Sequence, residues 1–303
     1  MTRTIACVAC LDPGRSVHTL TFIAAVDIVG DLLSNTGVKI VLYDDGADPV
    51  AGRAIADVIV ASGTDCVVGH FASAAAAAAA PVYEAAGIPM LLPAATMSAL
   101  TRYRCTYRIC DNDDDYARWL ARTMAERGLV PVRYASDGSA HGDSVIGALR
   151  AVDAMPGCSG KPAIVFAGRY AETIEFAKAL AGACAGAMAL VLTDDADAPS
   201  LEDDLALAGL SIEITPVYLA ALRPRPRGSR AEQILRAYRQ RHGADPGTYF
   251  WETVAAIEMA VAMPLDTGQS IETALGPLKP DVDGECRPHS FCLLRVGGEV
   301  DDE

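Results

Sequence analysis

The sequence predicts an α/β fold with two Rossmann-like lobes, each built around a parallel β-sheet. Short apolar runs, many of them rich in β-branched residues, alternate along the chain with amphipathic helical patterns of about 10–15 residues. Such runs are typical of buried parallel strands that carry helices on both faces of the sheet. The length of 303 residues suits about two domains. We therefore expect two successive series of βα units.

The first series occupies the first third of the chain, where each predicted strand is a short apolar run bounded by turn residues. Asp48 followed by Pro49 is a typical helix start, with an N-cap and a proline at the first helical position. The predicted strands are Ile5–Cys10, Val38–Tyr43, Cys66–Gly69 and Met90–Leu92. The predicted helices are Thr19–Leu33, Pro49–Ala61 and Ala74–Ala86.

The second series has the same alternation. Its predicted helices are Asp115–Arg127, Asp143–Ala154, Glu172–Ala183 and Leu201–Ala208. Its predicted strands are Val130–Tyr134, Ala163–Ala167, Ala187–Thr193 and Ser211–Thr215. After this series come a Pro/Arg linker (Leu222–Gly228) and two helices (Arg230–His242 and Phe250–Met263). The chain ends with a short strand pair near Ser290–Val296 and an acidic tail, Glu299–Glu303.

These patterns predict a chain that crosses between the lobes about three times. Lobe one is expected to contain residues 1–112 and about 220–279. Lobe two is expected to contain residues 113–219 and about 280–303. Two such lobes imply a ligand cleft between them, because ligands of open parallel sheets bind beyond the carboxyl ends of the strands.

Composition limits the possible partners. The chain has 25 Lys and Arg against 39 Asp and Glu, a net charge of −14, which disfavours nucleic acid and anionic membrane as partners. No uncharged apolar stretch is long enough to span a membrane. No secretory signal fits before Asp12, so the sequence as it stands predicts a cytoplasmic protein, or a periplasmic or extracellular one if an upstream signal was removed.

The nine cysteines predict reduced, buried side chains rather than a disulfide framework. Cys7 and Cys10 lie three residues apart in a predicted strand, so their side chains should point to opposite faces of the sheet. This spacing argues against a redox or metal pair. The cysteines are Cys7, Cys10, Cys66, Cys105, Cys110, Cys158, Cys184, Cys286 and Cys292.

No catalytic, nucleotide-binding or zinc motif occurs, so we expect no enzyme, no cofactor and no metal ion. The acidic run Asp111–Asp115 offers hard oxygen ligands for a divalent ion, but it lacks the glycine turn and terminal Glu of a calcium loop. An acidic first turn of the following helix explains the run better.

Two loops after predicted strands carry groups suited to a small polar ligand. Ser73 opens a helix after Gly69, where its hydroxyl and the free backbone N–H groups can hold an anion such as a carboxylate. The alternative is that Ser73 serves only as a helix N-cap. Thr96 follows the strand Met90–Leu92 and offers a hydroxyl beside the backbone of Ala94 and Ala95.

Together these segments resemble the type I periplasmic solute-binding proteins, and among them the branched-chain amino-acid (Leu/Ile/Val) binding class. The resemblance is dense over Tyr43–Asp115, recurs over Asp245–Gly284 and is weak between them. The stretches that carry it are Tyr43–Pro49, Val68–His70, Tyr83–Met90, Pro93–Thr96, Leu100–Thr101, Tyr107–Cys110, Phe250–Ala256 and Gly276–Leu278.

The resemblance implies roles for individual residues in lobe one. The serine that binds the ligand carboxylate in the family falls on Ser73. The backbone carbonyl and threonine that hold the ammonium and carboxylate fall on Ala94, with Ala95 beside it, and on Thr96. The disulfide pair of relatives is replaced by Ala47 and Ala72, which fits a reducing compartment.

In lobe two the sequence departs from the family. The family's aromatic residue falls near His141, and its tyrosine falls near Asp194 or Asp195. The ammonium-binding acid has no counterpart, because Thr215–Tyr218 is short relative to the family. We expect His141 to contact the ligand from a loop, and Asp194 or Asp195 to bind a ligand ammonium.

The sequence therefore predicts non-enzymatic binding of an amino acid or analogue by hinge closure, in the service of an ATP-driven importer. The protein partner would be the transporter permease. An alternative hypothesis is a cytoplasmic ligand sensor of the same fold that regulates a partner protein. A third, enzymatic hypothesis would use His141 with Asp194 or Asp195, but nothing pairs a nucleophile with a base.

Overall fold

The computed structural model describes residues 2–152, 160–181, 187–263, 269–288 and 291–298. The chain divides into two compact units. Unit 1 contains Met1–Asn112 and Pro224–Ser290, and unit 2 contains Asp113–Arg223 and Phe291–Glu303. Cys158, Cys184, the predicted helix ends at Ala154 and Ala183, and the acidic tail Glu299–Glu303 lie outside the described residues.

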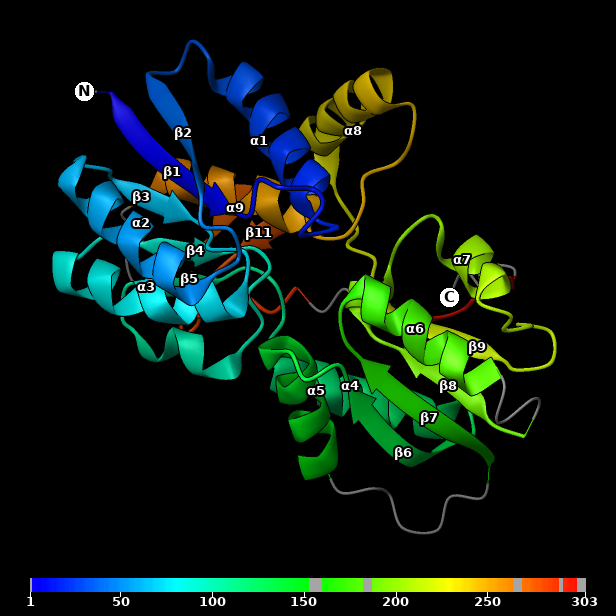
Figure 1. The fold of residues 1–303 in the computed structure, drawn as a ribbon. Coiled ribbons are helices and arrows are strands. Elements are labelled where there is room, and N and C mark those ends of the chain that lie inside the picture. Colours follow the sequence, from blue (N-terminus) through cyan, green and yellow to red (C-terminus); the bar gives the residue numbers. More distant parts are fainter. Residues whose placement is uncertain (1, 153–159, 182–186, 264–268, 289–290, 299–303) are drawn as a thin grey trace. The chain divides into compact units, whose positions relative to one another are not determined.

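Unit 1 is built on a five-stranded parallel sheet with the strand order β2-β1-β3-β4-β5 (Figure 1). The order places the first strand inside the sheet, as in doubly wound α/β folds. The strands are β1 (Arg3–Ala9), β2 (Val38–Asp44), β3 (Cys66–Val68), β4 (Met90–Leu92) and β5 (Thr106–Arg108).

Helices cover both faces of this sheet. Ala6 and Val8 of β1 belong to the apolar cluster under α2 and α3, and the alternating side chains of a strand leave Ile5 and Cys7 for the opposite face. There α9 packs against the strands and against α1. The helices are α1 (Thr19–Leu33), α2 (Pro49–Ala61), α3 (Ser73–Ala86), α8 (Gly228–His242) and α9 (Phe250–Ala262), with a short helix η1 (Ser98–Arg102) and the strand pair β10 (Ile271–Thr273) and β11 (Gly276–Leu278).

Unit 2 repeats the plan with the strand order β12-β9-β8-β7-β6. All of its strand pairs are parallel except β12 with β9. The strands are β6 (Leu129–Ser136), β7 (Lys161–Ala167), β8 (Ala189–Leu192), β9 (Val217–Leu222) and β12 (Phe291–Arg295). The helices are α4 (Asp113–Glu126), α5 (Ala140–Ala151), α6 (Tyr170–Ala181), η2 (Asp194–Ala196) and α7 (Leu201–Leu207).

The core of unit 2 follows from alternation along its strands. Ala163 and Val165 of β7 face the cluster that contains α4 and α5, whereas Ile164 and Phe166 face the cluster that contains α6 and α7. All four side chains are buried, because both faces of the sheet are covered. The predicted α/β class with helix-covered parallel sheets is confirmed.

Two sequence expectations differ from the structure. Ser211–Thr215 is not a strand; the strand is Val217–Leu222, whose buried apolar residues pair with β8 and β12. The sequence predicts that residues 280–288 belong to lobe two, but they lie in unit 1, because Glu285 forms a β-bridge and an ion pair with Arg108.

No helix among the described residues is long and apolar enough to cross a membrane. No disulfide joins the cysteines that the structure describes. Cys7 and Cys10 are both buried, Cys7 within β1 and Cys10 just after it. Burial raises the pKa of the Cys7 thiol above its usual range, which keeps this side chain uncharged.

Candidate functional site

Ser73 lies at the carboxyl edge of the unit 1 sheet, as the sequence predicts. It is the first residue of α3, and the N-cap position is taken by Ala72, which makes no side-chain cap hydrogen bond. The Ser73 hydroxyl instead accepts a 3.4 Å hydrogen bond from the backbone N–H of Met97. The hypothesis that Ser73 is only an N-cap is therefore wrong, and its side chain joins the loops after β3 and β4.

The loop after β4 places Ala94, Ala95 and Thr96 at the same edge, all three buried. Its shape is held by the side chain of Arg108 in β5. Arg108 donates from Nη1 to the carbonyl oxygen of Ala95 at 2.9 Å and from Nη2 to that of Met97 at 2.8 Å. One guanidinium group thus fixes the backbone on either side of Thr96.

Arg108 is fully buried, so its charge requires a partner. Its Nε lies 3.2 Å from Oε2 of Glu285, and Oε1 of Glu285 accepts a 3.0 Å hydrogen bond from the Thr101 hydroxyl. Sequence reasoning treated Arg108 only as part of a crossover and did not single out Glu285. An arginine directly before the apolar pair Ile109 and Cys110 is the available signal, but nothing local indicates its distant partner.

A second buried group fixes the loop that leads into Ser73. Nδ1 of His70 lies 2.8 Å from Oδ2 of Asp45, and its Nε2 lies 3.0 Å from the hydroxyl of Tyr83. All three residues are buried. Gly69 precedes this group with φ of +115°, and a Cβ there would lie 2.1 Å from the carbonyl oxygen of Val8. Only glycine fits that close approach, so the loop passes directly over β1.

In unit 2, His141 lies in the first turn of α5 and not in a loop before Asp143, as the sequence suggested. The helix begins earlier because the Ser139 side chain caps it, accepting a hydrogen bond from the Gly142 N–H at 3.1 Å. The His141 side chain is 20% exposed. It is therefore held by the helix and not by a mobile segment.

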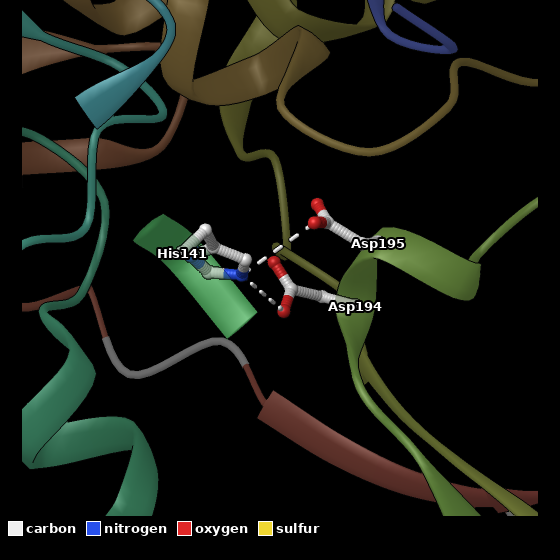
Figure 2. Close-up of side chains that lie close together, drawn as sticks. All are labelled: His141, Asp194 and Asp195. Atoms are coloured by element: carbon white, nitrogen blue, oxygen red, sulfur yellow. Dashed lines mark ion pairs between the residues drawn. The ribbon is translucent and has the colours of Figure 1, made fainter. Parts of the chain in front are cut away.

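The structure brings His141, Asp194 and Asp195 together, as Figure 2 shows. Nε2 of His141 lies 3.9 Å from Oδ1 of Asp194 and 3.7 Å from Oδ2 of Asp195. The aspartates belong to η2, which follows β8, and Asp194 is buried. On the other side of the ring, Nδ1 lies 3.9 Å from Oδ1 of Asp113.

The charges of this group determine its protonation. Burial works against the charged imidazolium, but the negative charges of Asp195, Asp194, Asp113 and Asp137 outweigh it and raise the pKa of His141 to about 9. The three nearest carboxylates still outnumber the single imidazolium.

The acidic run Asp111–Asp115 enters α4, whose first turn contains Asp113, Asp114 and Asp115. This is the position expected of an acidic helix start. Asp113 is buried and accepts a hydrogen bond from the hydroxyl of Ser144 in α5, so its carboxylate faces the neighbouring helix rather than a loop of oxygen ligands.

Glu252, in the first turn of α9, is a buried acid that sequence reasoning did not single out. Neither of its carboxylate oxygens has a hydrogen-bond partner in another residue within the described parts of the chain. Burial raises the pKa of Glu252 to about 7, against the lowering effect of a hydrogen bond from its own backbone N–H and with a smaller contribution from the charge of Asp111. The apolar sequence pattern of α9 does not predict that Glu252 lacks a hydrogen-bond donor from another residue.

The ion pair of Arg108 should contribute strongly to stability. We expect Glu285→Gln to lower the free energy of unfolding by about 3 kcal/mol, because the buried guanidinium loses its counter-charge. Asp57→Asn, which removes an exposed ion pair with Arg53, should cost less than about 1 kcal/mol. Urea denaturation of both variants measures this difference, and equal small losses would contradict the assigned role of Glu285.

The pKa of Glu252 predicts how stability depends on pH. A carboxyl with a raised folded pKa is stabilised in its protonated form, so stability falls as the pH rises from the ordinary value of 4.5 toward about 7. Glu252→Gln removes this loss, because the glutamine side chain does not ionise. The free energy of unfolding of the variant, relative to that of the unmodified chain, should therefore be higher at pH 8 than at pH 5 by roughly 2–3 kcal/mol. Urea titrations at both pH values measure this. The exposed Glu232→Gln is the control, and an identical pH dependence in all three proteins would refute the prediction.

Known proteins resemble this chain in two ways. No protein-family model matches it. The Leu/Ile/Val-binding protein of Escherichia coli is 35% identical over 121 residues, which cover 38% of this chain and 33% of that protein. The chain thus aligns with about a third of the length of such curated relatives.

Solved structures match nearly the whole chain. A branched-chain amino acid transporter substrate-binding protein from Streptococcus pneumoniae, in complex with isoleucine, has a TM-score of 0.75 and 15% identity, covering 97% of this chain and 100% of that one. A solute-binding protein of an ABC transporter from R. palustris, in complex with 4-hydroxybenzoate, has a TM-score of 0.75 and 17% identity, covering 97% and 93%. The chain therefore has the fold of the type I periplasmic binding proteins and, over part of its length, resembles their Leu/Ile/Val-binding class.

Proposed function

We propose that this chain is a non-enzymatic binding protein for an amino acid or a similar small carboxylate, and that it serves an ABC importer. The single observation that carries the proposal is the pair of fixed loops in unit 1. Ser73 and the backbone beside Thr96 are joined by the Met97–Ser73 hydrogen bond and held by Arg108. Groups fixed before the ligand arrives lose little conformational entropy on binding.

The chemistry of these loops suits a carboxylate. A hydroxyl at the start of a helix, together with the unpaired N–H groups of its first turn, favours an anion. Isoleucine and 4-hydroxybenzoate, the molecules in the two similar solved structures, both carry a carboxylate. We propose that Ser73, Thr96 and the backbone of Ala94 and Ala95 bind this group.

The acidic group in unit 2 favours an amino acid over an aromatic acid. Asp194, Asp195 and Asp113 all lie within 4 Å of the ring nitrogens of His141, so carboxylates predominate around this imidazole. Carboxylates attract a ligand ammonium group, whereas a benzoate carries no positive charge. We propose that Asp194 or Asp195 binds the ligand ammonium.

Binding would proceed by hinge closure, with lobe one capturing the ligand first and lobe two closing over it. No bond is made or broken in this mechanism. The importer role places the chain in the periplasm or outside the cell, and the permease is its partner. The sensor hypothesis differs in compartment and partner but uses the same residues.

Substitution of the unit 1 hydroxyls tests the binding site. Ser73→Ala and Thr96→Val should each weaken leucine binding by about 1–3 kcal/mol, because each removes a hydrogen bond to a charged group. Isothermal titration calorimetry, after a thermal-shift screen of amino acids and hydroxybenzoates, measures this loss.

Ser62→Ala is the matched control, because Ser62 follows α2 at the opposite edge of the same sheet. Its affinity for leucine should be unchanged. No thermal shift with any α-amino acid would refute the amino-acid ligand, and unchanged affinity in both site variants would refute the assignment of Ser73 and Thr96.

A further inference from the structure

The side chains of His141, Asp194 and Asp195 present three metal-ligating atoms to one another. One ring nitrogen and two carboxylate oxygens all lie within 4.8 Å of one another. The residues come from two separate elements, α5 and η2, so their convergence is produced by the fold and not by local sequence. Figure 2 shows both aspartates directed at the same edge of the imidazole.

The opposite edge of the imidazole also has a carboxylate. Asp113 lies 3.9 Å from Nδ1, longer than a hydrogen bond but close enough for an ion pair, while Asp194 and Asp195 lie on the Nε2 side. Metal-binding histidines commonly direct their second nitrogen at a carboxylate, which fixes the ring and increases its basicity. Asp113 is itself held by the Ser144 hydroxyl, so this outer partner has a defined position.

We propose that His141, Asp194 and Asp195 form a binding site for a divalent transition-metal ion of the zinc type. An imidazole with two carboxylates is a donor set that suits such ions, whereas Ca²⁺ and Mg²⁺ prefer oxygen ligands alone. The two carboxylates balance the charge of a divalent cation.

A bound ion would require the three ligand atoms to move closer together. Ligand atoms about 2.0–2.2 Å from a tetrahedral ion lie roughly 3.3–3.6 Å apart. The distances from Nε2 to the two carboxylates are 3.9 Å and 3.7 Å, a few tenths of an ångström too long. The two carboxylate oxygens lie within 4.8 Å of each other, and rotation of the aspartate side chains would bring them to bonding positions.

Three protein ligands leave one tetrahedral position open. Water or the carboxylate of a small molecule can fill that position. A bound ion would therefore supply positive charge where the proposed function places a ligand ammonium, and it would extend the range of ligands to acids without an amino group. The metal site itself does not depend on the proposed function.

Zinc titration of the full chain tests the proposal. After removal of metals with EDTA, calorimetric titration with ZnCl₂ at pH 8 should show one binding event that weakens at least tenfold in His141→Ala, Asp194→Asn and Asp195→Asn. Asp195 is the most exposed of the three ligands, and Asp195→Asn keeps the test decisive if Asp194→Asn fails to fold. Circular dichroism verifies folding.

Two controls distinguish this site from other zinc-binding groups. His242→Ala and Asp203→Asn, which alter an exposed histidine and an exposed acid elsewhere, should leave the titration unchanged. Zinc binding that persists in all three site variants belongs to other groups, such as thiols, and would overturn the proposal. Absence of any binding event would overturn it equally.

A separate comparison keeps this proposal distinct from the proposed function. Ser73→Ala should weaken leucine binding and leave zinc affinity unchanged. In the unmodified chain, zinc binding without leucine binding shows that the proposed function has failed, whereas leucine binding without zinc binding shows that the metal site has failed.

Discussion

The buried guanidinium of Arg108 organises the candidate ligand-binding edge of unit 1. A full positive charge in the interior is stable only when hydrogen bonds and a counter-charge compensate it. Arg108 meets this requirement with the carbonyl oxygens of Ala95 and Met97 and with the carboxylate of Glu285. Arg108 therefore holds the backbone on both sides of Thr96, and its ion pair holds the late segment around Glu285 in unit 1.

The Asp45–His70–Tyr83 group does the same for the neighbouring loop. It holds the chain between β3 and α3 in place, so that the Ser73 hydroxyl accepts a hydrogen bond from the N–H of Met97. Both loops are thus fixed by buried polar side chains rather than by their own sequence. The arrangement favours tight binding, because little order remains to be imposed by a ligand.

Much of the fold could be predicted because its signals are local. Pro49–Ala61 begins and ends as predicted, and the Asp48 side chain caps it by accepting from the N–H groups of Val50 and Ala51. Ser211–Thr215 misled because its alternating pattern resembles a strand. The pairing with β8 and β12 selects the apolar run Val217–Leu222 instead, and such pairing is not visible in a short window.

The candidate site was predictable only in part. Ser73 and Thr96 could be found because they follow strands of one parallel sheet, whose carboxyl ends share an edge. His141 and the two aspartates were each suggested separately, and their convergence depends on the order of β6, β7 and β8. The sequence did not indicate the roles of Arg108, Glu285 and Glu252. The pairing of Arg108 with Glu285, and the absence of such a partner for Glu252 among the described residues, become visible only in the folded chain.

A crystal structure of the full chain grown with leucine tests the central claim most directly, namely that the fixed loops of unit 1 bind a carboxylate. The account predicts that the leucine carboxylate lies within hydrogen-bond distance of the Ser73 and Thr96 hydroxyls, with the Arg108 contacts unchanged. Leucine bound elsewhere, or bound with its carboxylate directed away from both hydroxyls, would contradict it.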